Sequence, residues 1–165
     1  MVQDERRPRL ATVDDADEIG RLLHDFNSEF ETPSPGADVL AARLRMLLAG
    51  EATIAIIAGT PAVAVALITL RSNVWYPGQV ALLDELYVMP HLRGQGIGST
   101  ILHQLVKIAR AKGVELIEIN VDEGDVGAQR FYERHGFSPT EPDSNERSLY
   151  YSQELTAPKR EGRDG

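Results

Sequence analysis

The sequence predicts a mixed α/β fold made by a single domain. Strand-like segments, in which apolar residues alternate with others, are followed by helix-like segments with apolar residues at every third or fourth position. The clearest series runs from a strand at 81–88 through a helix at 94–112 and a strand at 114–121 to a helix at 126–135. A hairpin precedes this series, and elements in such an order predict a mixed sheet with helices on its faces.

The amino-terminal part supplies a strand and two helices. A short strand is expected at 9–13, and Asp14 can cap a helix that ends before the stretch "ETPSPG". The apolar stripe of this helix consists of Ile19, Leu22, Leu23, Phe26 and Phe30. A second helix is expected at about 37–48.

The stretch 52–70 contains 19 residues without a charge, which is nearly the length of a membrane span. The turn signal Gly59-Thr60-Pro61 interrupts it, and apolar residues alternate with small ones on both sides. A hairpin of two buried strands is therefore expected here, rather than a membrane helix.

The carboxy-terminal part completes the predicted domain. Two last strands are expected at about 137–143 and 147–155, which brings the sheet to about six to seven strands with about four helices. The domain is expected to span 9–155. The remaining 156–165 form a polar tail that we expect to be disordered.

Composition excludes several classes of protein. The net charge is −8, from 17 basic and 25 acidic residues, and this balance argues against binding to nucleic acid or to an anionic membrane. The chain has no cysteine, which excludes disulfides, thiolate metal sites and a cysteine nucleophile. Its four histidines have no ligand spacing, so no metal site is expected. The first ten residues mix both charge signs and have no apolar core, so no signal peptide is expected and a cytoplasmic protein is expected.

Three glycines stand where a helix should begin, at Gly94, Gly96 and Gly98. Glycine inside a helix costs about 1 kcal/mol relative to alanine, so another use is expected for them. Unpaired backbone amides and the positive end of the helix dipole attract anions, and glycine lets a phosphate approach the backbone closely. Arg93 adds a charged donor at the same place. The spacing matches neither a dinucleotide fingerprint nor a Walker loop, because Ser99 stands at the third glycine position and no lysine precedes it.

The stretch "ELYVMPHLRGQGIGSTIL" resembles the coenzyme A-binding signature R/Q-x-x-G-x-G/A of the GNAT superfamily of N-acetyltransferases. About 35 residues later, "AQRFYERHGF" is similar to a second motif of that family. The resemblance implies a GNAT-like, mostly antiparallel sheet, with acetyl-CoA bound at the helix start after the fourth strand. It implies backbone contacts to the pantetheine arm and acetyl group from Leu86, Tyr87 and Val88. It also implies a pyrophosphate cradle made by the amides of Arg93, Gly94, Gln95, Gly96, Ile97, Gly98 and Ser99.

Acetyl transfer to an amine needs a base, and it benefits from an acid near the leaving sulfur. Tyr132 matches the family's acid position, four residues before Gly136, although it could instead be a core aromatic residue beside Phe131. Glu85 is the best candidate for the base, directly or through water. Adjacent Asp84 is expected on the opposite face of the strand. The carboxylates of Asp122 and Glu123 remain alternatives.

One position departs from the family pattern. Many relatives carry asparagine three residues before the alanine of the second motif, where this chain has Asp125. An aspartate caps a helix as well as asparagine does, but an ionised carboxylate cannot donate a hydrogen bond to the coenzyme. Asp125 is included among the residues expected to bind the coenzyme, although whether it contacts the coenzyme directly is undecided from the sequence.

Two function classes follow. The first is an enzyme that transfers acetyl from acetyl-CoA to a primary amine by direct attack in a ternary complex. The second is an idle acyl-CoA-binding module that acts as a sensor or partner protein. The acceptor could be a small molecule or a peptide, and a homodimer is a common outcome on base rates. Glu29 and Glu31, expected in the loop between the first two helices, point with Glu85 to a cationic amine, unless they only solvate a helix end.

Overall fold

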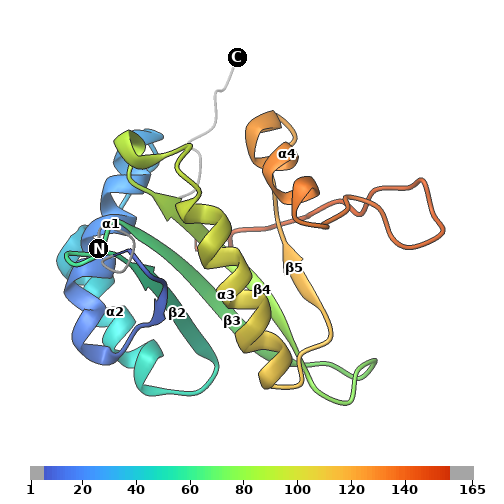
Figure 1. Cartoon of the computed structure of the whole chain (residues 1–165), viewed down its shortest axis with the longest axis horizontal. Helices are drawn as coiled ribbons and strands as arrows, with labels where there is room; N and C mark the ends of the chain where they lie inside the picture. Colours follow the sequence, from blue (N-terminus) through green and yellow to red (C-terminus); the bar gives the residue numbers. More distant parts are fainter. Residues whose placement is uncertain (1–5, 157–165) are drawn as a thin grey trace, which may run out of the picture. The chain divides into compact units, whose positions relative to one another are not determined.

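The computed structural model describes residues 6–156 and divides the chain into two compact units, Met1–Asn120 and Val121–Gly165. The predicted disorder of the tail concerns residues that, apart from Thr156, lie outside the described part. The first unit contains, in order, β1 (Arg9–Leu10), α1 (Ala16–Glu29), α2 (Ala37–Ala49), β2 (Thr53–Ala58), β3 (Ala64–Ser72), β4 (Gln79–Val88), α3 (Ile97–Ala111) and β5 (Ile117–Ile119) (Figure 1). Single 3₁₀ turns at Val13–Asp15 and Pro90–Leu92 precede α1 and α3.

The five strands form one sheet in the order β1-β2-β3-β4-β5. Neighbouring strands are antiparallel from β1 to β4, and β5 lies parallel to β4. The mixed, mostly antiparallel sheet and its four helices were predicted correctly, and the hairpin is β2 and β3. Its strands pair from Thr53 with Thr69 to Ala58 with Ala64, and Gly59 starts the turn with a φ of +96°.

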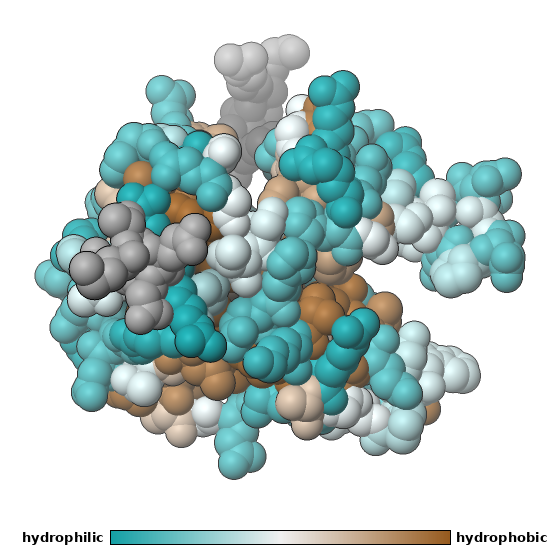
Figure 2. All heavy atoms as spheres, in the orientation of Figure 1, coloured by the Kyte–Doolittle hydropathy of each residue, from teal (hydrophilic) through white to brown (hydrophobic). Residues whose placement is uncertain are grey.

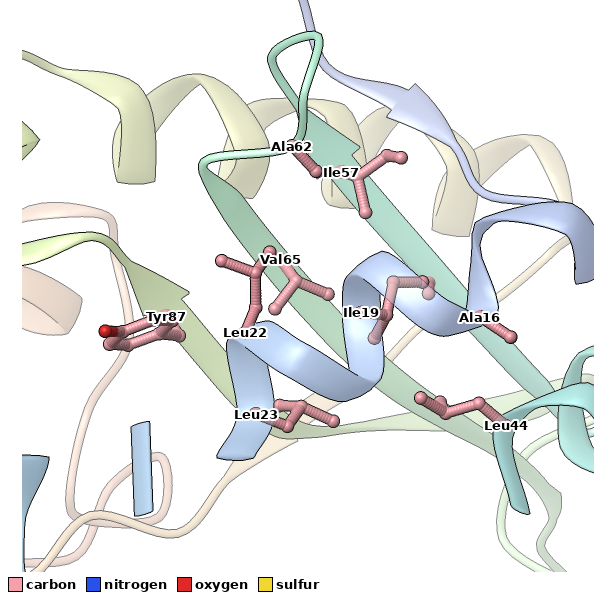
Figure 3. Packing of buried hydrophobic residues seen from close by; sticks show 10 residues of the cluster. Ala16, Ile19, Leu22, Leu23, Leu44, Ile57, Ala62, Val65 and Tyr87 are labelled. Carbon is pink, nitrogen blue, oxygen red and sulfur yellow. The ribbon is translucent and has the colours of Figure 1, made fainter. Parts of the chain in front are cut away.

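Both faces of the sheet are covered in this unit. Ala55, Ile57 and Val65 belong to a buried cluster with Leu44 of α2 and with three residues of the predicted α1 stripe, Ile19, Leu22 and Leu23 (Figure 3). Phe26 packs against this cluster, whereas Phe30 lies just beyond α1 and is exposed, contrary to the prediction. Ile56 and Ile68 point to the opposite face and are equally buried, and α3 contacts β2, β3 and β4. In the same cluster, Tyr87 of β4 lies against α1 (Figure 3). The two predicted amino-terminal helices therefore pack on one face and α3 on the other.

The first strand and the first helix differ from expectation at their junction. The strand ends at Leu10, and a 3₁₀ turn separates it from α1. Asp14 does not cap the helix. The carboxylate of Asp15 instead accepts hydrogen bonds from the Thr12 amide at 2.7 Å and from Arg9 at 2.7 and 2.9 Å, which stabilises the turn.

The second unit contains α4 (Val126–Arg134) and, in its described part, no strand. The prediction of strands at 137–143 and 147–155 was therefore wrong, and only an isolated bridge joins Thr140 to Arg147. Pro139 and Pro142 cannot donate to a ladder. The side chains of Leu149 and Tyr151 are exposed, so the last segment buries no face that would fix a register.

Hydrophilic residues cover most of the visible face of the molecule, with separate hydrophobic areas between them (Figure 2). Within residues 6–156, no helix combines the length and the apolar character that a bilayer crossing requires.

Candidate coenzyme and catalytic site

The start of α3 is shaped by two glycines with left-handed backbone conformations. Gly94 has a φ of +77° and Gly96, the N-cap residue, has a φ of +82°. L-residues with side chains rarely adopt such angles, and this explains why the helix begins at Ile97 and not at 94. A Cβ built on either glycine would meet no atom within 4 Å, so the space beside the bend is open.

This bend fits a phosphate group. The first amides of a helix have no partner inside the helix, and the N-cap residue Gly96 has no side chain that could accept from them. Ile97, Gly98 and Ser99, which provide these amides, were all predicted to line the pyrophosphate cradle. The open space beside Gly94 and Gly96 leaves the approach to the backbone unobstructed.

The strand that precedes this bend has one edge without a strand partner. β4 pairs with β5 only from Ala81 to Leu83, and β5 ends at Ile119. Beyond that point, β4 from Glu85 to Val88 pairs with β3 alone within the part of the chain that the structure describes. Leu86, Tyr87 and Val88, the residues expected to bind the pantetheine arm through their backbone, all lie on this half-paired segment.

A β-bulge at Asp84 changes which way the next residues point. In the register of β3 with β4, Leu67 pairs with Glu85 and Ile68 pairs with Leu83, so Asp84 is an extra residue. Glu85 thereby shares the face of Leu67, which packs against the cluster of α1 and α2. Asp84 accepts a 2.6 Å hydrogen bond from the hydroxyl of Thr69, which is on that same face. The expectation that Asp84 and Glu85 face opposite sides was therefore wrong, because it assumed a regular strand.

The charge of Asp84 and the burial of Glu85 both act on the carboxyl group of Glu85. Burial raises the pKa of Glu85 above its ordinary value, and the nearby charge of Asp84 raises it further. A carboxylate with a raised pKa is a stronger base than an exposed glutamate. The geometry thus gives Glu85 the property that a proton acceptor needs.

The side chain of Arg93 is engaged within the protein. Its Nε donates to the carbonyl of Val88 at 2.9 Å, and its two terminal nitrogens donate to Glu29 at 2.7 and 2.8 Å. Glu29 is the last residue of α1 and not a loop residue as expected. Its charge is paired with Arg93, whereas Glu31 lies beyond the helix with a φ of +53°.

The second unit holds the other expected site residues. Asp125 caps α4 as predicted, since its Oδ1 accepts from the amide of Ala128 at 2.9 Å. Tyr132 is half-buried on α4 between two aromatic rings, with centroid distances of 5.1 Å to Phe131 and 5.8 Å to Phe137. Of the alternative bases, Glu123 is exposed and lies 3.4 Å from Arg147.

Two contacts of the signature loop carry no sequence signal. Arg6 donates to the side chain of Gln95 at 2.9 Å across 89 positions of the chain. Glu29 and Arg93 are 64 positions apart. Neither pair belongs to a motif, and no periodicity connects them, so only the fold shows that the residues meet.

The chain is similar to known acetyltransferases. The model of the Acetyltransferase (GNAT) family matches residues 18–137. The crystal structure of a protein from Arthrobacter sp. FB24, named as an acetyltransferase, is 51% identical, with a TM-score of 0.85 over 90% of this chain and 95% of that chain.

Two curated relatives extend the comparison. The thialysine N-epsilon-acetyltransferase of Caenorhabditis elegans is 28% identical over 74% of this chain and 76% of its own length. An uncharacterized N-acetyltransferase of Methanocaldococcus jannaschii is 35% identical over 38% of this chain, and the match spans only 28% of that relative. The family model covers well over half of the chain, from α1 through the helix start at Gly96 to the end of α4. The chain therefore belongs to the acetyltransferase (GNAT) family.

Proposed function

We propose that this protein transfers the acetyl group of acetyl-CoA to a primary amine. The observation that carries the proposal is the continuity of the half-paired end of β4 with the glycine bend at the start of α3. Together they offer backbone donors and acceptors to an extended arm and amides to its phosphates. Acetyl-CoA supplies the thioester carbonyl that the amine attacks. Residues of this chain bind the two substrates and transfer the protons.

In the proposed reaction, the amine attacks the thioester carbon, a C–N bond forms and the C–S bond breaks. The incoming ammonium group must lose a proton before attack and the nitrogen loses a second one afterwards. Glu85 accepts a proton, directly or through water, and its raised pKa supports this role. Tyr132 provides a proton to the leaving sulfur, and Asp125 stays a candidate for a coenzyme contact.

The acceptor is proposed to be a cationic amine. Support comes from Asp84 and Glu85, which the bulge places on one face of the sheet, and less from Glu29, whose charge Arg93 balances. The name of the Caenorhabditis elegans relative, a thialysine N-epsilon-acetyltransferase, also points to a side-chain amine. Both small molecules and peptide amines carry such a group.

The proposal also covers the extent of the domain, the oligomeric state and the cellular location of the protein. The family match at 18–137 runs through both compact units, which supports a single functional domain at 9–155. Dimerisation and cytoplasmic location stay predictions, and light scattering of the purified protein tests the first.

The proposal is tested by two measurements on the full chain. Calorimetric titration with acetyl-CoA measures binding, and release of coenzyme A is followed with a thiol reagent over a panel of primary amines. Binding together with amine-dependent release supports the proposal. Binding without release on any amine supports the idle acyl-CoA-binding module, and absence of binding contradicts both.

A further inference from the structure

Arg93 joins three parts of the first unit through one guanidinium group. Each of its nitrogen atoms has an acceptor: the Val88 carbonyl at the end of β4 and the two carboxylate oxygens of Glu29 at the end of α1. Two parallel hydrogen bonds between a guanidinium and a carboxylate form a geometrically specific pair. The residue that follows Arg93 is Gly94, where the chain turns into the bend.

We propose that Arg93 and Glu29 are positioning residues that fix the path of the coenzyme loop, and that the Arg93 side chain does not itself bind the pyrophosphate. The inference rests on the proposed coenzyme site, whose loop it describes. It departs from the sequence-based expectation that Arg93 adds a charged donor to that site.

The surroundings of the pair support a bracing role. The Arg93 guanidinium carbon lies 5.5 Å from the centroid of the Tyr87 ring, which adds a cation–π contact. Tyr87 is 4% exposed, and its ring centroid lies 5.1 Å from that of Phe26 in α1. Arg93 is therefore held by a packed aromatic pair as well as by its hydrogen bonds.

The effect on the ligand follows from preorganisation. Arg93 is tied both to β4 and to α1, so the direction in which the backbone enters Gly94 is fixed before a ligand arrives. A loop already in its bound conformation binds more tightly, because less conformational entropy is lost on binding. Removing either partner of the brace frees the loop and weakens binding.

The two roles of Arg93 predict opposite effects of Glu29→Gln. If Arg93 braces the loop, this variant loses the bidentate pair and binds acetyl-CoA more weakly, with a Kd raised about threefold to tenfold. If Arg93 contacts the pyrophosphate, the same variant frees the guanidinium and removes a negative charge nearby, so the Kd stays the same or falls.

Further variants sharpen the test. We expect Arg93→Gln to raise the Kd as much as Glu29→Gln does, and the double variant to raise it no further, since both changes break one brace. Arg93→Lys keeps the charge but not the fork geometry, so it should resemble Arg93→Gln. The matched control is Asp17→Asn, which removes another carboxylate of α1 that is paired with an arginine, Arg45, and should leave the Kd unchanged.

Calorimetric titration with acetyl-CoA at several salt concentrations provides the readout, with thermal unfolding as the check on folding. A braced loop gives Arg93→Gln a salt dependence equal to that of the natural protein, whereas loss of a phosphate contact reduces it. An unchanged or lower Kd for Glu29→Gln, or full recovery by Arg93→Lys, overturns the inference. Failure of the unmodified protein to bind acetyl-CoA contradicts the proposed function instead.

Discussion

Leu83 and Glu85 are two positions apart in β4 but face opposite sides of the sheet. Their partners in β3 are the adjacent residues Ile68 and Leu67, because Asp84 is an extra residue between them. In a regular strand, residues two apart share a face. The bulge therefore moves Glu85 from the α3 face to the face of α1 and α2, where Asp84 also lies.

The first prediction concerns the base. We expect Glu85→Gln to lower kcat/KM by about 10²-fold, the usual scale for the loss of a proton acceptor. The active form of Glu85 is the carboxylate, so kcat/KM should fall as the pH falls through its pKa. Because that pKa is raised, the decline should begin at a higher pH than for an ordinary glutamate. A pH profile of kcat/KM measures both effects.

Asp84→Asn serves as the matched control for this profile. The asparagine oxygen can still accept from Thr69, but the negative charge that raises the pKa of Glu85 is gone. We therefore expect the acidic limb of kcat/KM to move to lower pH, while kcat at saturating acceptor is largely kept. An acidic limb that survives in Glu85→Gln would show that another group accepts the proton.

A second prediction tests the glycine bend. Gly96→Glu should abolish acetyl-CoA binding, because a carboxylate at the helix start repels the pyrophosphate and fills the open space beside the backbone. Gly36→Glu is the matched control. Gly36 is the N-cap of α2, with a φ of +101° and no atom within 4 Å of its ideal Cβ, so this change also places a glutamate at a helix start whose backbone conformation favours glycine. Calorimetric titration measures the affinity of both folded variants for acetyl-CoA. If Gly96→Glu binds acetyl-CoA as tightly as Gly36→Glu does, the bend does not bind the pyrophosphate.

The third prediction concerns the acid. Tyr132→Phe should lower turnover by about 10²-fold or more and leave the Kd for acetyl-CoA little changed, because only the hydroxyl is lost. Tyr150→Phe, at a residue that is 73% exposed, is the control and should keep full activity. If single-turnover rates of Tyr132→Phe equal those of the natural protein, Tyr132 is a packing residue beside Phe131 and Phe137.

Local sequence patterns predicted most of the helices and strands. The features that were missed depend on pairing between residues far apart in the chain. The hairpin followed from the turn at Gly59, and the cap of α4 followed from Asp125, because each signal lies within a few residues. The bulge at Asp84 left no mark, since "LLDELYV" reads as an ordinary strand. The prediction of two last strands was wrong because a strand forms only beside a partner, and the pattern of one segment does not show whether a partner is present.

The candidate site divides in the same way. The glycines of the loop indicated their own backbone conformation, since only glycine tolerates a φ near +80° readily. The direction of the Arg93 side chain depended on Glu29, a residue 64 positions away in another element. From the sequence, Arg93 was expected to contact the phosphates of the coenzyme and Glu29 to attract the amine. The structure instead pairs Arg93 with Glu29.

The last prediction concerns the charge of the acceptor. Coulomb attraction acts over about 8–10 Å at physiological ionic strength, so carboxylates near the reacting nitrogen favour an ammonium group. If Asp84 and Glu85 attract the acceptor, its KM should rise with ionic strength. Asp84→Asn should blunt that rise, because it removes the negative charge beside Glu85.

Glu31 separates this explanation from the sequence-based one, in which Glu29 and Glu31 both steer the amine, so that Glu31→Gln would raise the KM about as much as Glu29→Gln does. Glu29 is already paired with Arg93, so Glu29→Gln leaves a guanidinium unbalanced and should raise the KM for a cationic amine at low salt. Glu31→Gln should have a small effect of the same sign, since Glu31 is exposed and screened by solvent. Initial rates for the best amine at several salt concentrations measure these differences. A best acceptor that is neutral or anionic, or a KM that does not depend on salt, would contradict electrostatic selection of the amine by this face of the sheet.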